Sequence, residues 1–200
     1  MMKNLLILLC SFLTFSSFSP QSGYNIGDTA SDFSLKNIDG KMVSLANIEA
    51  KGFVVVFTCN HCPFSVMYED RIIALSKKTE KLGYPLIAIN PNDDVKYPDD
   101  SFENMKIRAK EKGFKFPYLR DDSQKIAKKY GALRTPHVYV LKREGKELKV
   151  KYIGAIDDNA EDASAVKNNY VENAVIALSK NVAISPETTK AIGCTIKWKK

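Results

Sequence analysis

Five consecutive apolar residues at 53–57 run into the motif Cys-Asn-His-Cys-Pro at 59–63, with only Thr58 between them. An unbroken run of β-branched and aromatic side chains is typical of a central strand that is buried on both faces. Apolar residues at helical spacing then continue to Leu82, and Gly83 is suited to end a helix. The sequence therefore predicts that both cysteines lie between a buried strand and the helix that follows it.

Predicted strands and helices alternate along the rest of the chain. We expect strands at 42–45, 53–57, 86–89, 116–119, 137–141 and 149–156, and helices at 63–82, 102–112, 123–130 (capped by Ser123) and 163–178. This order predicts an α/β fold, with a central mixed sheet flanked by helices. Strand–helix–strand followed by hairpin–helix is the element order of the thioredoxin fold. Residues 24–50 are then an N-terminal extension, and residues 90–112 an insertion after the second core strand.

The first 22 residues have the layout of a secretory signal peptide. Lys3 provides a positive start, and a mainly apolar stretch follows that is short for a membrane span. Leu9 in front of Cys10 argues against a lipid attachment site. We therefore expect a cleaved signal at 1–22, one domain at 23–200, and an exported protein that is periplasmic or extracellular. An uncleaved N-terminal segment that anchors the protein to the membrane is the alternative.

The formal net charge of +7 comes from 30 basic and 23 acidic side chains that are spread along the chain. Such a surface attracts acidic partners in general, but it does not identify one. We recognise no nucleic-acid-binding module, and we expect neither a nucleic acid partner nor a cofactor. We expect the protein to be a monomer.

A Cys-X-X-Cys pair at the start of a helix has a specific chemical use. Unpaired backbone N–H groups and the helix dipole favour negative charge there. They lower the pKa of the first thiol and so supply the thiolate that attacks disulfides. We therefore predict Cys59 as the nucleophile and Cys62 as the resolving cysteine, which attacks the mixed disulfide and releases the product. Asn60 and His61 are predicted to tune the pair, with His61 making the disulfide more oxidising.

A static disulfide or a metal site is the alternative use of these cysteines. A structural zinc site needs four ligands, and only Cys194, His61 and His137 remain as candidates to join the pair. We assign no metal ligands, although Cys59, Cys62 and His137 would meet in a suitable fold. Without the signal peptide three cysteines remain, so at most one intramolecular pair is complete. We predict a structural or unassigned role for Cys194, with a second resolving thiol as the alternative.

The motif at 59–63 and several other stretches resemble a known family. The similar stretches are residues 54–64, 88–93, 131–137, 152–158 and 191–198. They resemble the thioredoxin-like branch of the alkyl hydroperoxide reductase/thiol-specific antioxidant (redoxin) superfamily, of the Cys-Asn-His-Cys-Pro type. The resemblance covers essentially the mature chain and implies a thioredoxin fold and a redox role. It also implies that Thr135 and Pro136 bind substrate, with a cis proline that offers backbone groups to an extended chain.

Two departures from related families bear on the activity. Thr58 stands where ordinary thioredoxins carry a tryptophan before the first cysteine. Val56 stands where true peroxiredoxins carry a threonine three residues before their reactive cysteine. Because that threonine and its neighbouring proline polarise the O–O bond of a peroxide, these departures argue against peroxidase activity.

The leading hypothesis is a thiol–disulfide oxidoreductase that acts on the thiols and disulfides of exported proteins. It would exchange electrons with an upstream redox partner. A thiol-dependent peroxidase that uses Cys59 is the second hypothesis. A metal-binding or redox-silent module on the same fold is the third, because a fold alone does not decide among these functions.

Overall fold

The computed structural model describes residues 23–200, so the predicted signal peptide at 1–22 lies outside the described residues and stays a prediction. The strands are β1 (Thr29–Ala30), β2 (Ser34–Asn37), β3 (Met42–Ser44), β4 (Gly52–Phe57), β5 (Leu86–Asn90), β6 (Tyr118–Arg120), β7 (Arg134–Thr135), β8 (His137–Glu144), β9 (Glu147–Gly154) and β10 (Cys194–Thr195). The helices are α1 (Pro63–Lys81), α2 (Phe102–Lys112), α3 (Lys125–Tyr130) and α4 (Tyr170–Ser179). Within this described part of the chain, no helix is long and apolar enough to cross a bilayer.

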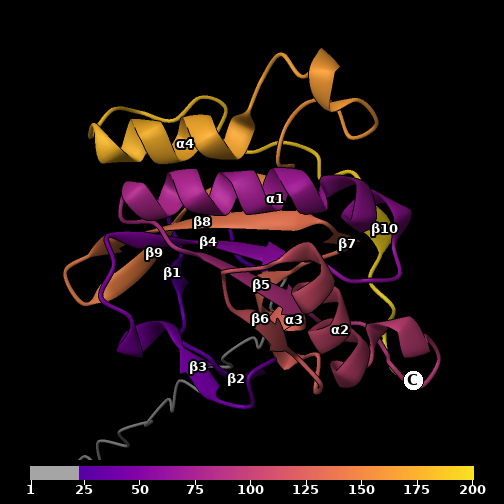
Figure 1. Cartoon of the computed structure of the whole chain (residues 1–200). Coiled ribbons are helices and arrows are strands. Elements are labelled where there is room, and N and C mark those ends of the chain that lie inside the picture. Colours follow the sequence, from indigo (N-terminus) through magenta and orange to yellow (C-terminus); the bar gives the residue numbers. More distant parts are fainter. Residues whose placement is uncertain (1–22) are drawn as a thin grey trace, which may run out of the picture.

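Eight of the described strands form one mixed sheet in the order β1-β9-β8-β4-β5-β6-β2-β3 (Figure 1). β4 lies near its centre, parallel to β5 and antiparallel to β8. Figure 1 shows α1 and α4 side by side over one face of the sheet, with α3 beyond the other face. This arrangement confirms the predicted α/β fold, a central mixed sheet flanked by helices.

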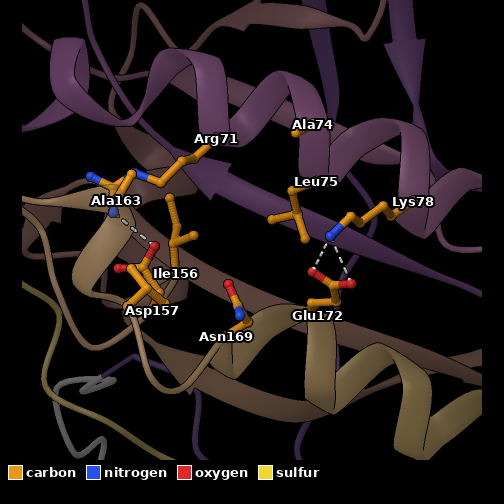
Figure 2. Close-up of a pocket in the computed structure, with 10 residues that line it drawn as sticks. Arg71, Ala74, Leu75, Lys78, Ile156, Asp157, Ala163, Asn169 and Glu172 are labelled. Atoms are coloured by element: carbon orange, nitrogen blue, oxygen red, sulfur yellow. Dashed lines mark hydrogen bonds and ion pairs between the residues drawn. The ribbon is translucent and has the colours of Figure 1, made fainter.

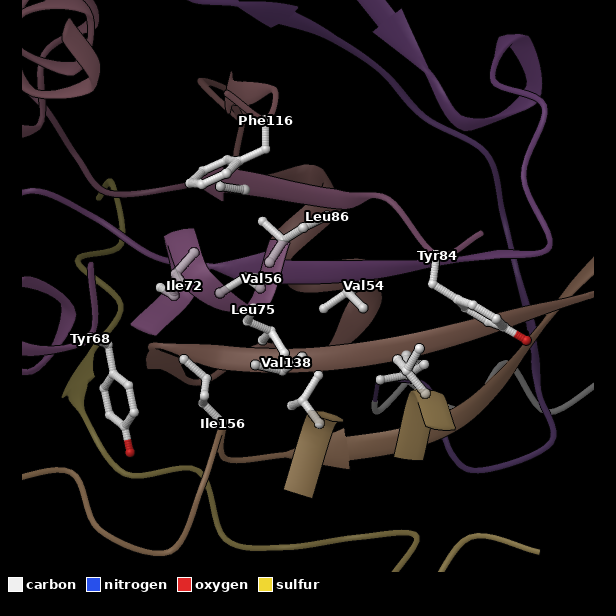
Figure 3. Packing of buried hydrophobic residues seen from close by; sticks show 14 of the residues in the cluster. Val54, Val56, Tyr68, Ile72, Leu75, Tyr84, Leu86, Phe116, Val138 and Ile156 are labelled. Atoms are coloured by element: carbon white, nitrogen blue, oxygen red, sulfur yellow. The ribbon is translucent and has the colours of Figure 1, made fainter. Parts of the chain in front are cut away.

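The two faces of β4 enter two different hydrophobic cores, because side chains alternate along a strand. Val54 and Val56 belong to the core shared with α1 and α4 (Figure 3). Phe53, Val55 and Phe57 belong to the core shared with α3 and the N-terminal extension. All five side chains are fully buried. Burial of each contributes about 1.5–3 kcal/mol, so β4 is a rigid base for the cysteine motif that follows it.

The predicted N-terminal extension joins this sheet, whereas the predicted insertion adds a helix between two of its strands. β1 pairs with β9, and the β2–β3 hairpin pairs with β6. The hairpin turn holds Gly40 at a φ of 86°, a conformation that glycine adopts without strain. The insertion carries α2 between β5 and β6, and Asp100 in the loop before α2 contacts the cysteine motif.

α4 is shorter than predicted, since it begins at Tyr170 rather than at residue 163. The preceding residues form a single 3₁₀ turn and an irregular loop. The Asp158 carboxylate accepts hydrogen bonds from the backbone N–H of Lys167 and from the Asn168 side chain. Side-chain bonds to the backbone compete with helical hydrogen bonds, and this competition delays the start of the helix.

α3 also starts later than predicted, at Lys125 rather than at Ser123. The N-cap position belongs to Gln124, which has a positive φ of 58°. The buried carboxylate of Asp121 accepts the N–H of Ala127 at 2.8 Å, and Ser123 Oγ accepts the N–H of Lys125 at 3.4 Å. Asp121 and Ser123 therefore share the capping that is predicted for the serine alone.

The C-terminal segment crosses the molecule and pairs with β7 near its end. Thr188 forms a parallel bridge with Ile153, and β10 pairs antiparallel with β7, with Cys194 opposite Thr135. Ile196 then enters the core shared with α3 and is 3% exposed. The tail is therefore an integral part of the domain and lies beside the cysteine motif.

A buried ion pair ties α1 to the loop between β9 and α4. Arg71 donates hydrogen bonds to the Asp157 carboxylate at 2.9 Å and to the carbonyl oxygens of Asn159 and Ala160 at 2.6 Å each. Tyr68 donates to the other carboxylate oxygen of Asp157 at 2.7 Å. Figure 2 shows this pair at one end of a pocket of about 230 Å³ between α1 and α4. The pair holds the loop that leads to α4 against α1, the helix that follows the cysteine motif.

We expect Arg71→Gln to lower the free energy of unfolding by about 3 kcal/mol, because it leaves the carboxylate of Asp157 buried without its cation. Urea unfolding measures this loss. The control is Lys78→Gln, which removes the more exposed ion pair between α1 and α4, from Lys78 to Glu172. That change should cost less than about 1 kcal/mol. Equal losses in the two variants would contradict the structural role of the buried pair.

Candidate active site

The cysteine motif lies at the junction of β4 and α1, as predicted. β4 ends at Phe57, Cys62 is the N-cap of α1, and Pro63 is the first residue of the helix. Proline suits this position because its fixed φ is helical and because the N–H that it lacks would have no partner there. The Val66 N–H bonds the Cys62 carbonyl at 3.0 Å. The first turn of the helix thus holds Cys62 in place.

Cys59 is a free thiol that is 3% exposed. The thiol donates to Thr135 Oγ1 at 3.3 Å and lies 3.7 Å from Ser65 Oγ. Its sulfur accepts the backbone N–H of Cys62 at 3.4 Å. Since hydroxyl groups can rotate, both hydroxyls can donate to the sulfur once it is a thiolate.

Burial raises the pKa of the Cys59 thiol above its ordinary value, and the nearby carboxylate of Asp100 raises it further. Hydrogen bonds from Thr135, Cys62 and Ser65 lower the pKa by smaller amounts. The expectation that the start of the helix lowers the pKa of Cys59 is therefore wrong for the structure described, in which Cys59 is a buried free thiol. Loss of hydration disfavours the charged thiolate more than its hydrogen bonds favour it.

Cys62 is joined to Cys194 by a disulfide that spans 132 residues, with the Cα atoms 5.9 Å apart. The sequence instead predicts that Cys62 pairs with Cys59, and it leaves Cys194 with a structural or unassigned role. Both predictions differ from the disulfide in the structure. The backbone N–H of Cys194 also lies 3.3 Å from the Cys62 sulfur. The sequence does not reveal this partner, because the contact depends on the path of the C-terminal tail across the molecule.

Thr135 contacts Cys59, Cys62 and Cys194, the three cysteines of residues 23–200. Its hydroxyl contacts Cys59, its carbonyl oxygen lies 3.2 Å from the Cys62 sulfur, and Cys194 is its partner in the β7–β10 pair. The Thr135–Pro136 peptide bond is cis, as the family resemblance implied. β10 occupies the edge of β7, so the chain's own tail lies where an extended substrate was expected.

Asp100, a fully buried carboxylate, fastens the loop of the motif. Its Oδ1 accepts the backbone N–H groups of Asn60 at 2.7 Å and His61 at 3.2 Å. The side-chain amides of Asn90 and Asn92 donate to the two carboxylate oxygens at 3.1 and 2.8 Å. No local sequence pattern identifies this acidic residue, because its contact with the motif joins residues 40 positions apart.

The side chains of Asn60 and His61 contact the insertion and β6. Asn60 donates to the Asp99 carbonyl at 2.8 Å and accepts from the Tyr118 hydroxyl at 2.9 Å. The His61 ring lies 4.8 Å from the Tyr97 ring, and its Nδ1 is 3.9 Å from an Asp99 carboxylate oxygen. Asn60 therefore anchors the loop, whereas the effect of His61 on the thiolate stays a prediction.

His137 directly follows Pro136 and is buried. Its Nδ1 accepts the Leu133 N–H at 3.3 Å, and burial lowers its pKa to about 4, so the ring is neutral at physiological pH. In residues 23–200, no three His, Cys, Asp or Glu side chains are grouped to hold a metal ion. The meeting of Cys59, Cys62 and His137 that the metal hypothesis requires is therefore not found.

Comparison with known proteins agrees with this geometry. The AhpC/TSA family matches residues 26–153. The thiol-disulfide oxidoreductase ResA of Bacillus thuringiensis subsp. konkukian is 25% identical over 149 residues, which cover 71% of this chain and 80% of that protein.

Solved structures resemble the chain over most of its length. An uncharacterized conserved protein from Geobacillus kaustophilus has a TM-score of 0.81 and 36% identity, and the match covers 88% of this chain and 93% of that one. The exposed lipoprotein thioredoxin of Streptococcus pneumoniae shares the fold, with a TM-score of 0.53 and 20% identity over 76% of this chain and 100% of that one. With the family match spanning well over half of the 200 residues, the chain belongs to the AhpC/TSA family, as one of its thioredoxin-like members.

Proposed function

We propose that the protein carries out thiol–disulfide exchange with Cys59 as the attacking cysteine and Cys62 as the resolving cysteine. Its family and its ResA relatives make it a thiol–disulfide oxidoreductase. The placement of both sulfurs against Thr135, next to Pro136 and at the start of α1, supports these roles most strongly. Of the cysteines in residues 23–200, Cys59 is the one with a free thiol.

The exchange proceeds in two steps. The Cys59 thiolate attacks a substrate disulfide, a bond forms to one substrate sulfur, and the other substrate sulfur leaves as a thiolate. The Cys62 thiolate then attacks the Cys59 sulfur and displaces the remaining substrate thiolate, so the substrate gains two electrons and the protein loses two. The Thr135 hydroxyl and the Cys62 N–H stabilise negative charge on Cys59 during these steps.

The burial of Cys59 places a requirement on this reaction. The side chain is 3% exposed, and Asp100 fastens the adjoining backbone of Asn60 and His61. A substrate disulfide therefore reaches the sulfur only when the loop moves away from Asp100. Thr135 and Pro136 border the same sulfurs, but β10 pairs with the backbone of Thr135. We therefore propose that a substrate contacts the side chains of these two residues rather than the strand edge that β10 occupies.

We propose that the substrates are thiols and disulfides of exported proteins. The predicted signal peptide at 1–22 supports a periplasmic or extracellular location, with a membrane anchor if the segment stays uncleaved. In such a compartment the cysteines work repeatedly only if an upstream redox partner restores their starting state. We propose a monomer as the working form.

We expect Cys59→Ser to lower disulfide-reducing turnover at least about 100-fold, because serine forms no mixed disulfide. The measurement is reduction of insulin with dithiothreitol as the electron source. Cys10→Ser, in the predicted signal segment, is the matched control and should retain wild-type turnover.

Three outcomes would contradict the proposed roles. Turnover that survives Cys59→Ser would exclude that cysteine as the attacking residue. Consumption of hydrogen peroxide that depends on Cys59, without reduction of insulin, would favour the peroxidase. A stoichiometric copper or zinc complex that requires Cys59 and Cys62 would favour the metal-binding module.

We expect Asp100→Asn to lower the pKa of Cys59, because it removes a negative charge that disfavours the thiolate. The rate of Cys59 alkylation is measured against pH by mass spectrometry, with the Cys62–Cys194 disulfide intact. The midpoint of the profile should move to lower pH.

The matched control is Asp99→Asn, which changes the neighbouring exposed carboxylate and should leave the midpoint in place. A merely loosened loop would raise the alkylation rate at every pH without moving the midpoint. That result for Asp100→Asn would contradict an electrostatic effect of Asp100 on the thiol.

A further inference from the structure

The Cys62–Cys194 disulfide brings a third sulfur to the proposed site. Cys62 is bonded to Cys194 while Cys59 stays a thiol whose sulfur accepts the Cys62 N–H at 3.4 Å. The sulfurs of Cys59 and Cys62 both contact Thr135, and Cys194 pairs with Thr135 across β7 and β10. Cys62 therefore has two candidate partners for a disulfide, Cys59 and Cys194, and both of them contact Thr135.

The tail holds Cys194 in place through contacts that do not involve its sulfur. The Ile196 N–H bonds the Leu133 carbonyl at 3.2 Å, and the Ile196 side chain is buried. The Lys197 N–H bonds the side-chain oxygen of Asn92 at 2.9 Å. Because these contacts are independent of the disulfide, Cys194 stays beside Cys62 when the bond between them is reduced.

Gly193 allows the tail to approach the cis-proline segment closely. A Cβ atom at this position would lie 2.7 Å from the Thr135 carbonyl carbon and 3.0 Å from the Pro136 nitrogen, closer than packed atoms tolerate. The Gly193 carbonyl accepts a hydrogen bond from Arg134 at 3.1 Å. The absence of a side chain at residue 193 is therefore what lets Cys194 reach its place.

The three cysteines in the described part of the chain differ in their access to solvent. Cys59 is 3% exposed and Cys62 is 1% exposed, whereas Cys194 is only partly buried. Of the two bonded sulfurs, a thiol from outside therefore meets the one on Cys194 more readily.

We propose that Cys194 is a third redox-active cysteine, which takes over the disulfide at Cys62 and returns Cys59 to the thiol state. This proposal rests on the proposed exchange at Cys59 and Cys62. Once a Cys59–Cys62 bond has formed, the Cys194 thiolate attacks the Cys62 sulfur. The Cys62–Cys194 bond forms, the Cys59–Cys62 bond breaks, and Cys59 leaves as a thiolate that takes up a proton. The protein gains and loses no electrons in this step.

The oxidised protein is then reduced through Cys194. One thiolate of a dithiol protein attacks the Cys194 sulfur and displaces Cys62 as a thiolate. The second thiol of that partner attacks the resulting mixed disulfide and releases Cys194. The partner loses two electrons and ends as a disulfide. Substrates thus react at Cys59, and the reducing partner reacts at Cys194.

The first test maps the disulfide of the full chain at equilibrium with glutathione, by alkylation of free thiols and mass spectrometry. We expect oxidised wild-type protein to carry Cys62–Cys194 and an alkylated Cys59, and oxidised Cys194→Ser to carry Cys59–Cys62. A wild-type disulfide at Cys59–Cys62 alone would overturn the role of Cys194 and leave the proposed function standing. No reversible disulfide in either protein would overturn the proposed function itself.

A rate measurement separates an exchange pathway from a static bond. Reduced protein is mixed with a peptide disulfide and quenched with acid at successive times. We expect Cys59–Cys62 to appear before Cys62–Cys194, and Cys59→Ser to form Cys62–Cys194 at least about tenfold more slowly, because the oxidising equivalent enters at Cys59. Equal rates in wild type and Cys59→Ser would overturn the pathway.

Gly193→Ala tests the placement of Cys194 without removal of any sulfur. We expect the oxidised population to shift from Cys62–Cys194 towards Cys59–Cys62, because the added methyl group pushes the tail away from Thr135. The control is Thr195→Ala, on the other side of Cys194, where the side chain is exposed and the wild-type distribution should persist. An unchanged distribution in Gly193→Ala would contradict the role of this close approach.

Discussion

The packing of Thr135 against the loop between β4 and α1 is the contact on which the site depends. β8 begins just after this threonine and pairs with β4 along its length, with His137 opposite Phe57. This register determines where Thr135 faces Cys59, and the same short segment offers its free edge to β10. The register between β4 and β8 therefore helps to position the sulfurs of Cys59, Cys62 and Cys194. Two of these, Cys62 and Cys194, are bonded although they are 132 residues apart.

The insertion supplies a carboxylate with two opposed effects. Asp100 orders the motif by accepting the N–H groups of Asn60 and His61, and its charge also raises the pKa of the Cys59 thiol. With Cys62 bonded to the tail, Cys59 is thus both buried and protonated. Oxidants react with exposed thiolates far faster than with buried thiols. Burial therefore shields the Cys59 thiol from oxidants while Cys62 and Cys194 hold the disulfide.

Local patterns predict much of this fold. α2 has its predicted bounds because Ser101 caps its first turn and Gly113 ends it with a positive φ. The strand–cysteine–helix junction follows from its apolar run and motif, and the cis proline follows from the family resemblance. The Asp100 contact and the Cys62–Cys194 bond do not, since they join residues 40 and 132 positions apart. Such contacts arise from the path of a loop and a tail, which hydrophobic periodicity does not encode.

The length of chain between Cys62 and Cys194 couples redox state to folding stability. A disulfide across 132 residues restricts the unfolded chain enough to stabilise the fold by about 5 kcal/mol in the chain-entropy model. A Cys59–Cys62 bond closes so short a loop that it contributes only about 2 kcal/mol. Because folding and disulfide exchange are linked in one thermodynamic cycle, folding shifts the equilibrium from the Cys59–Cys62 bond towards the Cys62–Cys194 bond. The Cys62–Cys194 bond therefore links distant parts of the chain, and on this model the oxidised molecule should resist heat and proteolysis better than the reduced one.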